Sequence, residues 1–474
     1  MKTNLKATVM LALLLVGASC ERERGKPLLV EPKLELTEGS FLRLSIQNPN
    51  QVVLRSTETD PLKSVRSVGL LFYNQDTEVL EHIRELSVSS ISDLSNLVVK
   101  LPPADYKLVV VANASTQLRS SINPGAPLSD FIKGRELKAI DLFEASRGIV
   151  MTNQQGVISV PSSAFVSSVE NEQTAISIAL EPSLARVLVY GNPKFSRGTK
   201  GVTKPMYQIT NQAKQVSLLR QMNKLSDESE EQAQDNSSRE QRYAKSPYWD
   251  IWVQTPPRTT EDIAAYSTDN AQADRMKLEI KERSEDFATM LSQVALYAKE
   301  TTLPPNSYFE GTTPCVTIAY PYVPQGLQLE GEEGWVSYKG RYYREGAVKE
   351  MLRANTEPNS NELLQAMRQN QITETSFANS KGFDIAGVRF YYKAYSYYTV
   401  YIRHFSSETP SSGYGKYGIV RGNEYRISIA EITAPGSPVP PTYSNNLKPI
   451  TEQKAAGISV RIDEIPRRDQ EAQL

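Results

Sequence analysis

Histidine and cysteine are scarce in this chain of 474 residues, which contains only two of each. Metal binding and acid–base catalysis depend heavily on histidine, so the shortage argues against both kinds of site. The formal net charge is -1, which provides no basic field for nucleic acid. We therefore expect a protein that is not an enzyme, with no cofactor, no metal and no nucleic-acid partner.

Long apolar runs are also missing, and the N-terminus has the pattern of a secretory signal. Lys2 and Lys6 are followed by a short apolar stretch at 10–16 and by small residues at 17–19, directly before Cys20. The apolar stretch is too short to span a bilayer. We expect 1–19 to be a signal peptide and Cys20 to carry a lipid (palmitate among its acyl chains) that anchors the precursor to the outer membrane. A plain signal peptide before an incidental cysteine is the alternative.

Most of the remaining chain alternates as β-strands do. In the first such segment, Phe41 is followed by Leu42, Leu44 and Ile46 on one face. Strands at regular spacing with turn residues between them are typical of a sandwich. The other predicted strands lie at 68–73, 106–113, 148–152, 175–180, 185–190, 249–253, 315–320, 388–392, 398–402, 425–429 and 457–462. The pattern predicts an all-β fold of two tandem β-sandwich domains with minor helical insertions.

The second domain carries the less regular pieces. The boundary is expected near Pro182. Apolar residues recur with helical spacing in three segments, which predicts short surface helices at 286–299, 345–353 and 361–368. The polar, charged stretch 224–244 predicts a loop.

Several motifs invite a chemical interpretation, and a structural one is favoured for each. Gly413–Gly418 matches G-x-G-x-x-G, but a strand rather than a helix follows it, so a hairpin loop is expected instead of a nucleotide site. The acidic run 226–231 lacks the turn glycine of a calcium loop. Cys315 lies in an apolar strand and is expected to be buried and inert. The tyrosines at 391–401 suit a strand, with one face packed and the other exposed.

The order of these segments resembles the fimbrillins of Bacteroidales-type fimbriae, also called type V pili, over nearly the whole chain. It is most similar to the minor-fimbria shaft subunits. The matching features are Cys20, the strand and Arg-terminated loop at 41–55, the strands at 68–74 and 106–113, the segment 148–152, Leu184–Val187, 306–310 and 418–425. The resemblance implies transthyretin-like or Greek-key sandwiches and a cell-surface fimbrial protein.

The resemblance also implies proteolytic maturation. An arginine-specific protease is expected to cut the loop after the first strand, between Arg55 and Ser56, with Arg66 as the second choice. Turn-forming residues on both sides of Arg55 favour a loop there. Cleavage would remove the lipidated propeptide 20–55 together with its strand. Domains at 56–181 and 182–456 would remain.

Loss of the first strand would leave an apolar groove and unpaired backbone groups, which invite a replacement strand. The resemblance implies that the replacement is the C-terminal segment 457–474 of another subunit. Its alternating residues Ile458, Val460 and Ile462 would each contribute about 1.5–3 kcal/mol on burial. Such a heterologous, non-closing contact builds a filament from copies of the chain and accessory fimbrial subunits, which in this family supports adhesion and biofilm formation.

Two other functions remain open. Pro466 and the arginines at 467–468 depart from the apolar final strand of family shaft subunits. This departure favours the alternative of a tip or accessory adhesin that binds host or bacterial surface ligands. A surface lipoprotein that handles glycans is the third hypothesis, although no paired carboxylates signal a glycosidase.

Overall fold

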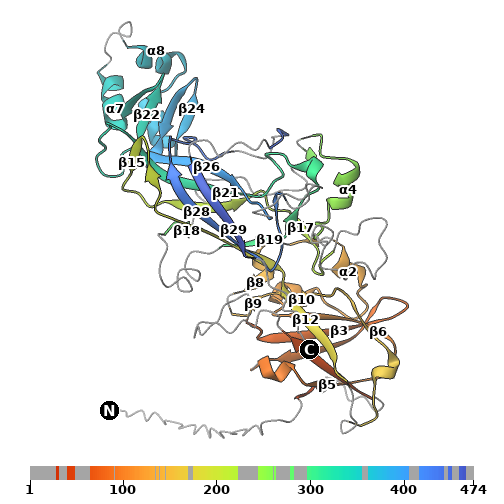
Figure 1. The fold of residues 1–474 in the computed structure, drawn as a ribbon. Coiled ribbons are helices and arrows are strands. Elements are labelled where there is room, and N and C mark those ends of the chain that lie inside the picture. Colours follow the sequence, from red (N-terminus) through yellow and green to blue (C-terminus); the bar gives the residue numbers. More distant parts are fainter. Residues whose placement is uncertain are drawn as a thin grey trace, which may run out of the picture.

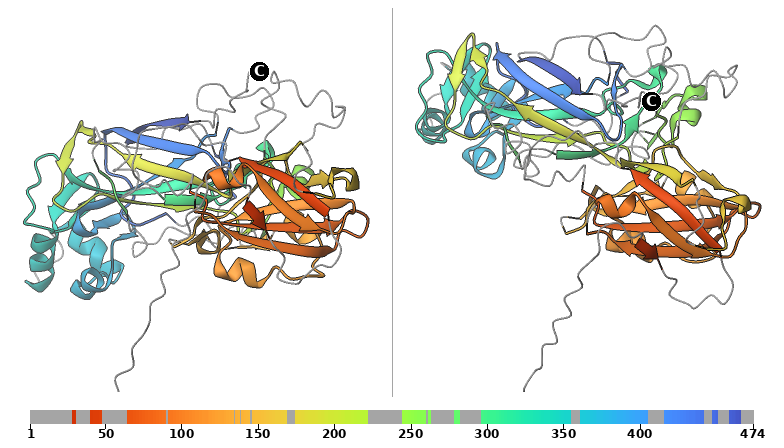
Figure 2. Two further views of the ribbon diagram at one scale, coloured as in Figure 1. Left: turned by 90° about the horizontal axis from the view of Figure 1, so that it is seen from below. Right: turned by 60° about the horizontal axis from the view of Figure 1, so that its bottom comes forward.

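The computed structural model describes most of the chain. The described residues are 28–30, 40–47, 64–89, 91–133, 135–137, 139–144, 146–168, 174–221, 244–259, 261–262, 278–281, 296–354, 361–404, 416–441, 447–450 and 458–465. Strands dominate these ranges, and the molecule is elongated, with the earliest strands at one end and the helices α7 (Glu345–Arg353) and α8 (Glu362–Gln369) at the other (Figures 1 and 2). No helix in the described ranges is long and apolar enough to cross a membrane.

The first part of the chain forms a nine-stranded sheet. Its strands, in spatial order, are β1 (Leu28–Val30), β5 (Leu97–Leu101), β2 (Ser40–Gln47), β12 (Ile176–Pro182), β10 (Met151–Asn153), β6 (Tyr106–Ala112), β3 (Ser67–Asn74) and β4 (Leu80–Ser87), with β11 (Ile158–Val160) also on β6. Side chains from both ends of this order share one core, so the sheet curls around it.

The strands β3 and β6 serve two cores at once. Leu70 and Phe72 face the core inside the curled sheet, whereas Leu71 and Tyr73 face a second cluster. That cluster also contains Leu184 and residues of the short helices α1 (Thr116–Ser120), α2 (Ser129–Ile132) and α3 (Ala139–Leu142). Because successive strand residues point to opposite faces, a continuous apolar run is the pattern that two-sided burial requires.

The later part of the chain forms a sandwich of two five-stranded sheets. One contains β14 (Lys194–Phe195), β28 (Glu424–Ile432), β13 (Leu184–Tyr190) and β19 (Leu296–Lys299), with β29 (Ile458–Ile465) on β28. The other contains β15 (Gly198–Lys200), β21 (Cys315–Pro324), β16 (Met206–Thr210) and β18 (Leu278–Glu279), with β26 (Tyr395–Tyr401) on β21.

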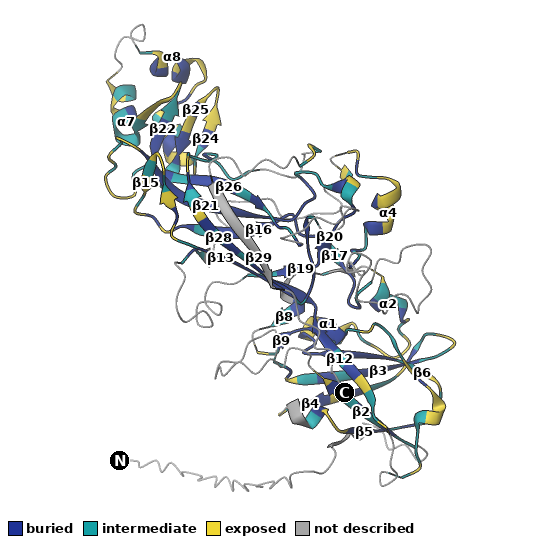
Figure 3. Cartoon of the chain, in the orientation of Figure 1, coloured by how far each residue is buried: buried dark blue, intermediate teal, exposed yellow. Residues whose placement is uncertain are grey.

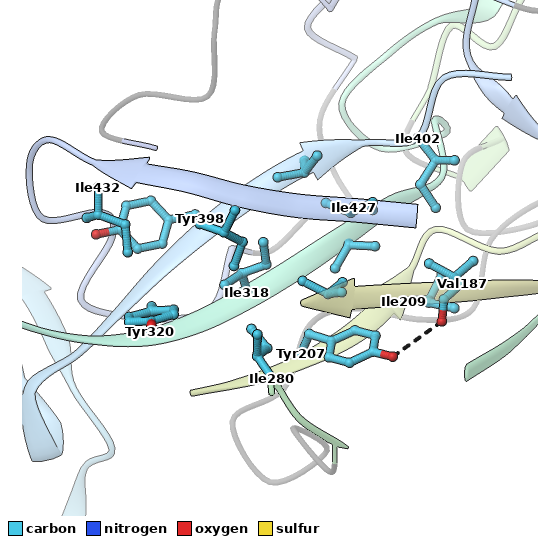
Figure 4. Packing of buried hydrophobic residues seen from close by; sticks show 14 of the residues in the cluster. Val187, Tyr207, Ile209, Ile280, Ile318, Tyr320, Tyr398, Ile402, Ile427 and Ile432 are labelled. Carbon is cyan, nitrogen blue, oxygen red and sulfur yellow. Dashed lines mark hydrogen bonds between the residues drawn. The ribbon is translucent and has the colours of Figure 1, made fainter. Parts of the chain in front are cut away.

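The core of this sandwich is rich in isoleucine, valine and tyrosine. Figure 4 shows Val187 and Ile427 from one sheet packed over Tyr207 and Ile318 from the other. The Tyr207 hydroxyl donates to the Val187 carbonyl across 3.3 Å, which satisfies the buried polar group between the sheets. Most strand residues of the nine-stranded sheet and of this sandwich are buried (Figure 3).

A small helix-covered sheet is inserted between β21 and β26. It has the order β23 (Arg341–Arg344), β22 (Trp335–Tyr338), β25 (Val388–Tyr391) and β24 (Phe383–Ile385), and it is accompanied by α7, α8 and α9 (Glu374–Asn379). Val348, Met367 and Phe377 from the three helices join one cluster with Phe390 of the sheet. The insertion therefore has a core of its own.

Short elements complete the described ranges. They are the pairs β17 (Gln215–Val216) with β7 (Arg135–Glu136), β20 (Thr301–Thr302) with β27 (Gly418–Ile419), and β8 (Phe143–Glu144) with β9 (Gly148–Ile149), the helix α4 (Trp249–Gln254), and the 3-10 turns η1 (Ile91–Leu94), η2 (Ser162–Ala164), η6 (Pro305–Ser307) and η8 (Tyr392–Ala394). The β17–β7 pair joins strands from opposite sides of Pro182.

The predicted all-β class with short helical insertions is confirmed. The predicted helices at 345–353 and 361–368 correspond to α7 and α8, and Asn361 caps α8 by accepting the N–H groups of Leu363 and Leu364. The arrangement as two tandem domains with the limits given above stays a prediction.

Two predictions of secondary structure and one of burial were wrong. The segment 249–253 is helical, because Trp249 and Trp252 are buried one helical turn apart while Ile251 and Val253 are 59% and 44% exposed. The end of the predicted helix 286–299 is strand β19, held by pairing with β13, and 286–295 lie outside the described residues. The tyrosine strand β26 is packed on both faces, since neighbouring Tyr397 and Tyr398 are both buried.

Candidate strand-exchange site

The first predicted strand is β2, and it lies inside the sheet rather than at its edge. On one side it pairs antiparallel with β5, with Leu42 opposite Val99. On the other side it pairs parallel with β12, with Leu44 opposite Ile176 and Ile46 opposite Ile178. Strands β5 and β12 therefore both form backbone hydrogen bonds with β2.

The side chains of β2 alternate as the sequence predicts. Leu42, Leu44 and Ile46 are at most 1% exposed and belong to the core of the curled sheet. The polar residue Arg43 between them points the other way, and its guanidinium donates to the side chain of Asn96. Burial of the three aliphatic side chains contributes about 1.5–3 kcal/mol each, and they are three of the twenty buried residues of this core.

The start of β2 has an additional partner that the sequence does not signal. The N–H of Phe41 donates to the carbonyl of Val166 at 2.8 Å, and the Val166 N–H donates back to Phe41 at 3.0 Å. Beyond Gln47 the predicted cleavage residues Arg55 and Ser56 lie outside the described residues, as does Cys20.

Arg66, the second choice for cleavage, directly precedes β3, and its backbone N–H and carbonyl are both hydrogen-bonded within the fold. Its N–H donates to the side chain of Asn113 at 2.8 Å, and its carbonyl accepts the N–H of Val88 at 2.9 Å. A protease must draw the backbone around the scissile bond into its own cleft, which these two bonds oppose.

The predicted donor segment contains strand β29, which pairs antiparallel with β28 of the same chain. In this register Ile458 lies opposite Ile432, Val460 opposite Ile429 and Ile462 opposite Ile427. The opposite side of β28 is occupied by β13 and β14. Among the described strands β29 has only β28 as a neighbour, so it forms an edge of its sheet (Figure 1).

Cys315 and His404, which the sequence offers as chemically reactive groups, are both buried and in contact with neighbouring side chains. Cys315 is fully buried, and the Thr210 hydroxyl lies 3.0 Å from its Sγ. His404 is buried with its Nδ1 2.9 Å from the Tyr425 hydroxyl, and burial followed by the charge of Arg220 lowers its pKa to about 3. Among the described residues, no group of three or more His, Cys, Asp or Glu side chains could hold a metal ion.

Motifs far apart in the sequence meet in the later sandwich. Strand β13 begins with the Leu184–Val187 motif, and β28 contains the end of the 418–425 motif. The strands run parallel with Arg186 opposite Glu424, and the Arg186 Nε donates to the Glu424 carboxylate at 2.7 Å within the protein interior. Tyr308, from the 306–310 motif, packs edge-on against Tyr417, and the centroids of the two rings lie 5.2 Å apart.

Residues 389–471 match the sequence model of a family described as major fimbrial subunit protein type IV, fimbrillin, C-terminal. The matched region includes β26, β27, β28 and β29, and thus both strands of the β28–β29 pair. This match confirms the resemblance to fimbrillins. It supports a fimbrial subunit, and it favours a structural over a catalytic role.

Three fimbrial proteins are among the solved structures that are similar to this chain. A fimbrilin of Porphyromonas gingivalis W83 is 14% identical, with a TM-score of 0.45 over 91% of this chain and 98% of that one. The tip fimbrial protein Mfa3 of Porphyromonas gingivalis is 11% identical, with a TM-score of 0.38 over 90% and 99% of the chains. A fimbrial assembly protein of Parabacteroides distasonis is 10% identical, with a TM-score of 0.30 over 83% and 92%. No curated protein sequence matches the chain.

Proposed function

We propose that this chain is a structural subunit of a cell-surface fimbria that polymerises by strand exchange. It is exported as a lipoprotein anchored through Cys20 and is cut after Arg55 by an arginine-specific protease. Cleavage releases the propeptide with β1 and β2. The gap between β5 and β12, called the β2 groove below, then accepts the C-terminal segment of a neighbouring subunit. The resulting fimbria serves adhesion and biofilm formation.

The central position of β2 is the observation that carries this proposal. Removing an edge strand leaves a sheet largely intact, but removing β2 unpairs β5 and β12 together and uncovers the contacts of Leu42, Leu44 and Ile46. An open sheet with unpaired backbone on two sides is a strong template for another strand. The subunit after cleavage is thus expected to be stable only when the groove is filled.

The C-terminal segment has the pattern that the groove requires. The β2 sequence Leu42–Ile46 reads Leu-Arg-Leu-Ser-Ile, and Ile458–Ile462 reads Ile-Ser-Val-Arg-Ile. Both place three aliphatic residues at alternate positions with one serine and one arginine between them. Since side chains alternate across a strand, such a segment can fill the core positions with aliphatic groups and direct its polar groups outward.

Cleavage is tested by Arg55→Ala, with Arg66→Ala as the matched control. In Arg55→Ala we expect a lipidated monomer that retains β2 and forms no filaments, because the groove never opens. Arg66→Ala is expected to mature normally, since the backbone of Arg66 is hydrogen-bonded within the fold. N-terminal sequencing of surface protein should give Ser56 in the control. Normal filaments from Arg55→Ala would refute the maturation step.

Insertion of the C-terminal strand into the β2 groove is tested by placing a charge at Val460, one of its three aliphatic positions. Val460→Asp places a carboxylate at the centre of the three aliphatic positions and should abolish polymerisation, because burying an unpaired charge is very costly. Ser459→Asp introduces the same charge at the neighbouring, outward position and should leave polymerisation intact. Electron microscopy of purified, processed protein distinguishes the two, and equal behaviour of the variants would contradict the proposed alternation.

A tip or accessory adhesin is the second candidate, favoured by Pro466 and the arginines that follow it, which shorten the usable donor strand. Deleting 457–474 separates the two roles. Deletion in a shaft subunit should eliminate fimbriae. Deletion in a tip or accessory subunit should leave the shaft in place and remove only this protein from it.

A further inference from the structure

Three arginines from different parts of the chain surround a cleft of about 420 Å³ beside the β3–β4 end of the nine-stranded sheet. Arg66 directly precedes β3, Arg119 belongs to α1 and Arg147 lies in the turn before β9. The remaining lining is mostly hydroxyl-bearing, with Ser67, Ser87 and Ser146, one carboxylate, Glu85, and Leu86. The cleft is therefore basic and polar, unlike an apolar ligand pocket.

The backbone that carries two of the arginines is held by one side chain. Asn113 adopts a φ of +54° at the end of β6 and is fully buried. Its amide donates to the Ser64 carbonyl at 2.6 Å and to the Ile149 carbonyl at 3.0 Å, and its carbonyl oxygen accepts the Arg66 N–H. The segments that carry Arg66 and Arg147 are thus fixed to each other before any ligand arrives, as a preformed site requires.

A carboxylate behind the cleft connects the third arginine to the other two. Glu144 accepts the Ser146 hydroxyl at 2.7 Å and the N–H of Thr116, the first residue of α1, at 3.3 Å. These hydrogen bonds, that of Ser146 first, lower the pKa of Glu144, which stays ionised. Glu144 therefore positions both the turn with Arg147 and the helix with Arg119.

The arginines retain donors for a ligand. The Arg66 Nη1 donates to the Ser146 carbonyl at 2.6 Å, the Arg119 Nη2 pairs with Glu85 at 2.5 Å, and the Arg147 Nε lies 3.4 Å from Glu144. Each guanidinium carries five N–H donors, so most of their capacity is unused by these contacts. Three cations face two carboxylates, which leaves an excess positive charge at the cleft.

We propose that this cleft binds an acidic saccharide, a sugar that bears a carboxylate or a sulfate group. The guanidinium groups would bind the anion in the bidentate geometry that arginine favours. The carboxylate of Glu85 decides between ligand classes. A bare inorganic anion such as sulfate has no donor for this carboxylate, whereas sugar hydroxyls donate hydrogen bonds to it, and the serine hydroxyls can accept them too. A peptide would leave its apolar side chains without apolar partners here.

The site does not depend on strand exchange. None of the residues that line the cleft belongs to β2, and in the sheet order β2 is separated from β3 by β12, β10 and β6, so the uncleaved chain, which retains β2, presents the complete cleft without polymerising. Failure of polymerisation and failure of saccharide binding are therefore distinguishable outcomes in the same protein.

The test is calorimetric titration of the purified full chain with a glucuronic-acid disaccharide, a sulfated disaccharide, a neutral disaccharide and sodium sulfate. We expect binding of one or both acidic sugars that weakens with added salt, and neither the neutral sugar nor sulfate should bind comparably. Arg119→Met and Arg147→Met should each reduce affinity by about tenfold or more. Arg353→Met is the matched control, since Arg353 forms a similar exposed ion pair with Glu374.

Each arm has a result that overturns the assignment. Equal affinity for sodium sulfate would show a plain anion site, and equal affinity for the neutral sugar would remove the role of the arginines. Acidic-sugar affinity that is unchanged in both arginine variants, or equally reduced in Arg353→Met, would place binding elsewhere. Near-ultraviolet circular dichroism should be unchanged in all three variants.

Discussion

A buried ion pair beside the junction of the two groups of sheets offers a direct test of what stabilises the molecule. Arg421 is 1% exposed, and its Nη2 lies 2.8 Å from the carboxylate of Glu300, which is itself buried. Its other donors reach the carbonyls of Leu218 at 2.8 Å and Ser217 at 2.5 Å. Although burial opposes its charge, the carboxylates of Glu300 and Glu181 raise the pKa of Arg421, which remains a cation.

Arg421→Met should destabilise the chain by about 3–5 kcal/mol, because removing one partner leaves the carboxylate of Glu300 buried and uncompensated. Typical stabilities are about 5–15 kcal/mol, so this loss is a large fraction of the whole. Replacing both residues, in Arg421→Met with Glu300→Met, removes the stranded charge and should recover a substantial part of the loss.

Urea denaturation followed by tryptophan fluorescence measures the effect. With a denaturant slope of roughly 2 kcal/mol/M, the single variant should unfold about 1.5–2.5 M earlier than the wild type. Arg389→Met is the control, because Arg389 forms an exposed pair with Asp384 at 2.9 Å and should cost about 1 kcal/mol or less. A single variant as stable as this control would refute the reasoning, as would a double variant less stable than the single.

Three further outcomes follow from individual residues. Leu44→Ala should lower the unfolding free energy of the unprocessed chain by about 2–5 kcal/mol in urea, because it leaves a cavity in the core around β2. Gly191→Ala should lower the melting temperature, since Gly191 has a φ of +139° and an added Cβ would lie 2.6 Å from the carbonyl oxygen of Ile429. His404 is neutral in the fold, with its pKa lowered from 6.5 to about 3. The contribution of neutral His404 to the free energy of unfolding should be full above pH 6.5 and should decline as the pH falls toward 3. Urea denaturation at a series of pH values should show a shallower decline in His404→Gln than in the wild type.

The strand content follows from the sequence where alternation or a continuous apolar run is strong. The alternation at 41–46 predicts β2, and the continuous run at 106–113 predicts β6, whose Val109 and Val110 serve two different cores. Alternation fails at 249–253, where Trp249 and Trp252 find separate apolar neighbours on one helical face. Such neighbours come from distant parts of the chain, so a local pattern does not reveal them.

The candidate sites differ in how far the sequence predicts them. The residues of β2 are visible in its alternation, but its central place between β5 and β12 is a matter of long-range pairing, and β12 begins more than 100 residues later. The arginine cleft has still less local signal. Arg66, Arg119 and Arg147 come together only because Asn113 and Glu144 bind several turns at once, and neither residue differs in sequence from an ordinary turn residue.

The geometry of the two strands gives the proposed exchange a direction. Strand β29 is bonded to β28 alone among the described strands, so releasing it breaks one ladder. The β2 groove offers a ladder on each side, to β5 and to β12, and a core with places for three aliphatic side chains. In the proposed exchange a C-terminal segment would give up eight residue pairs with β28 and could form the nine that β2 makes with β5 and β12, so the gain would come mainly from restoring the core that cleavage opens. Before cleavage β2 occupies that place and the exchange offers no gain, so in this proposal the cut at Arg55 would control when assembly begins.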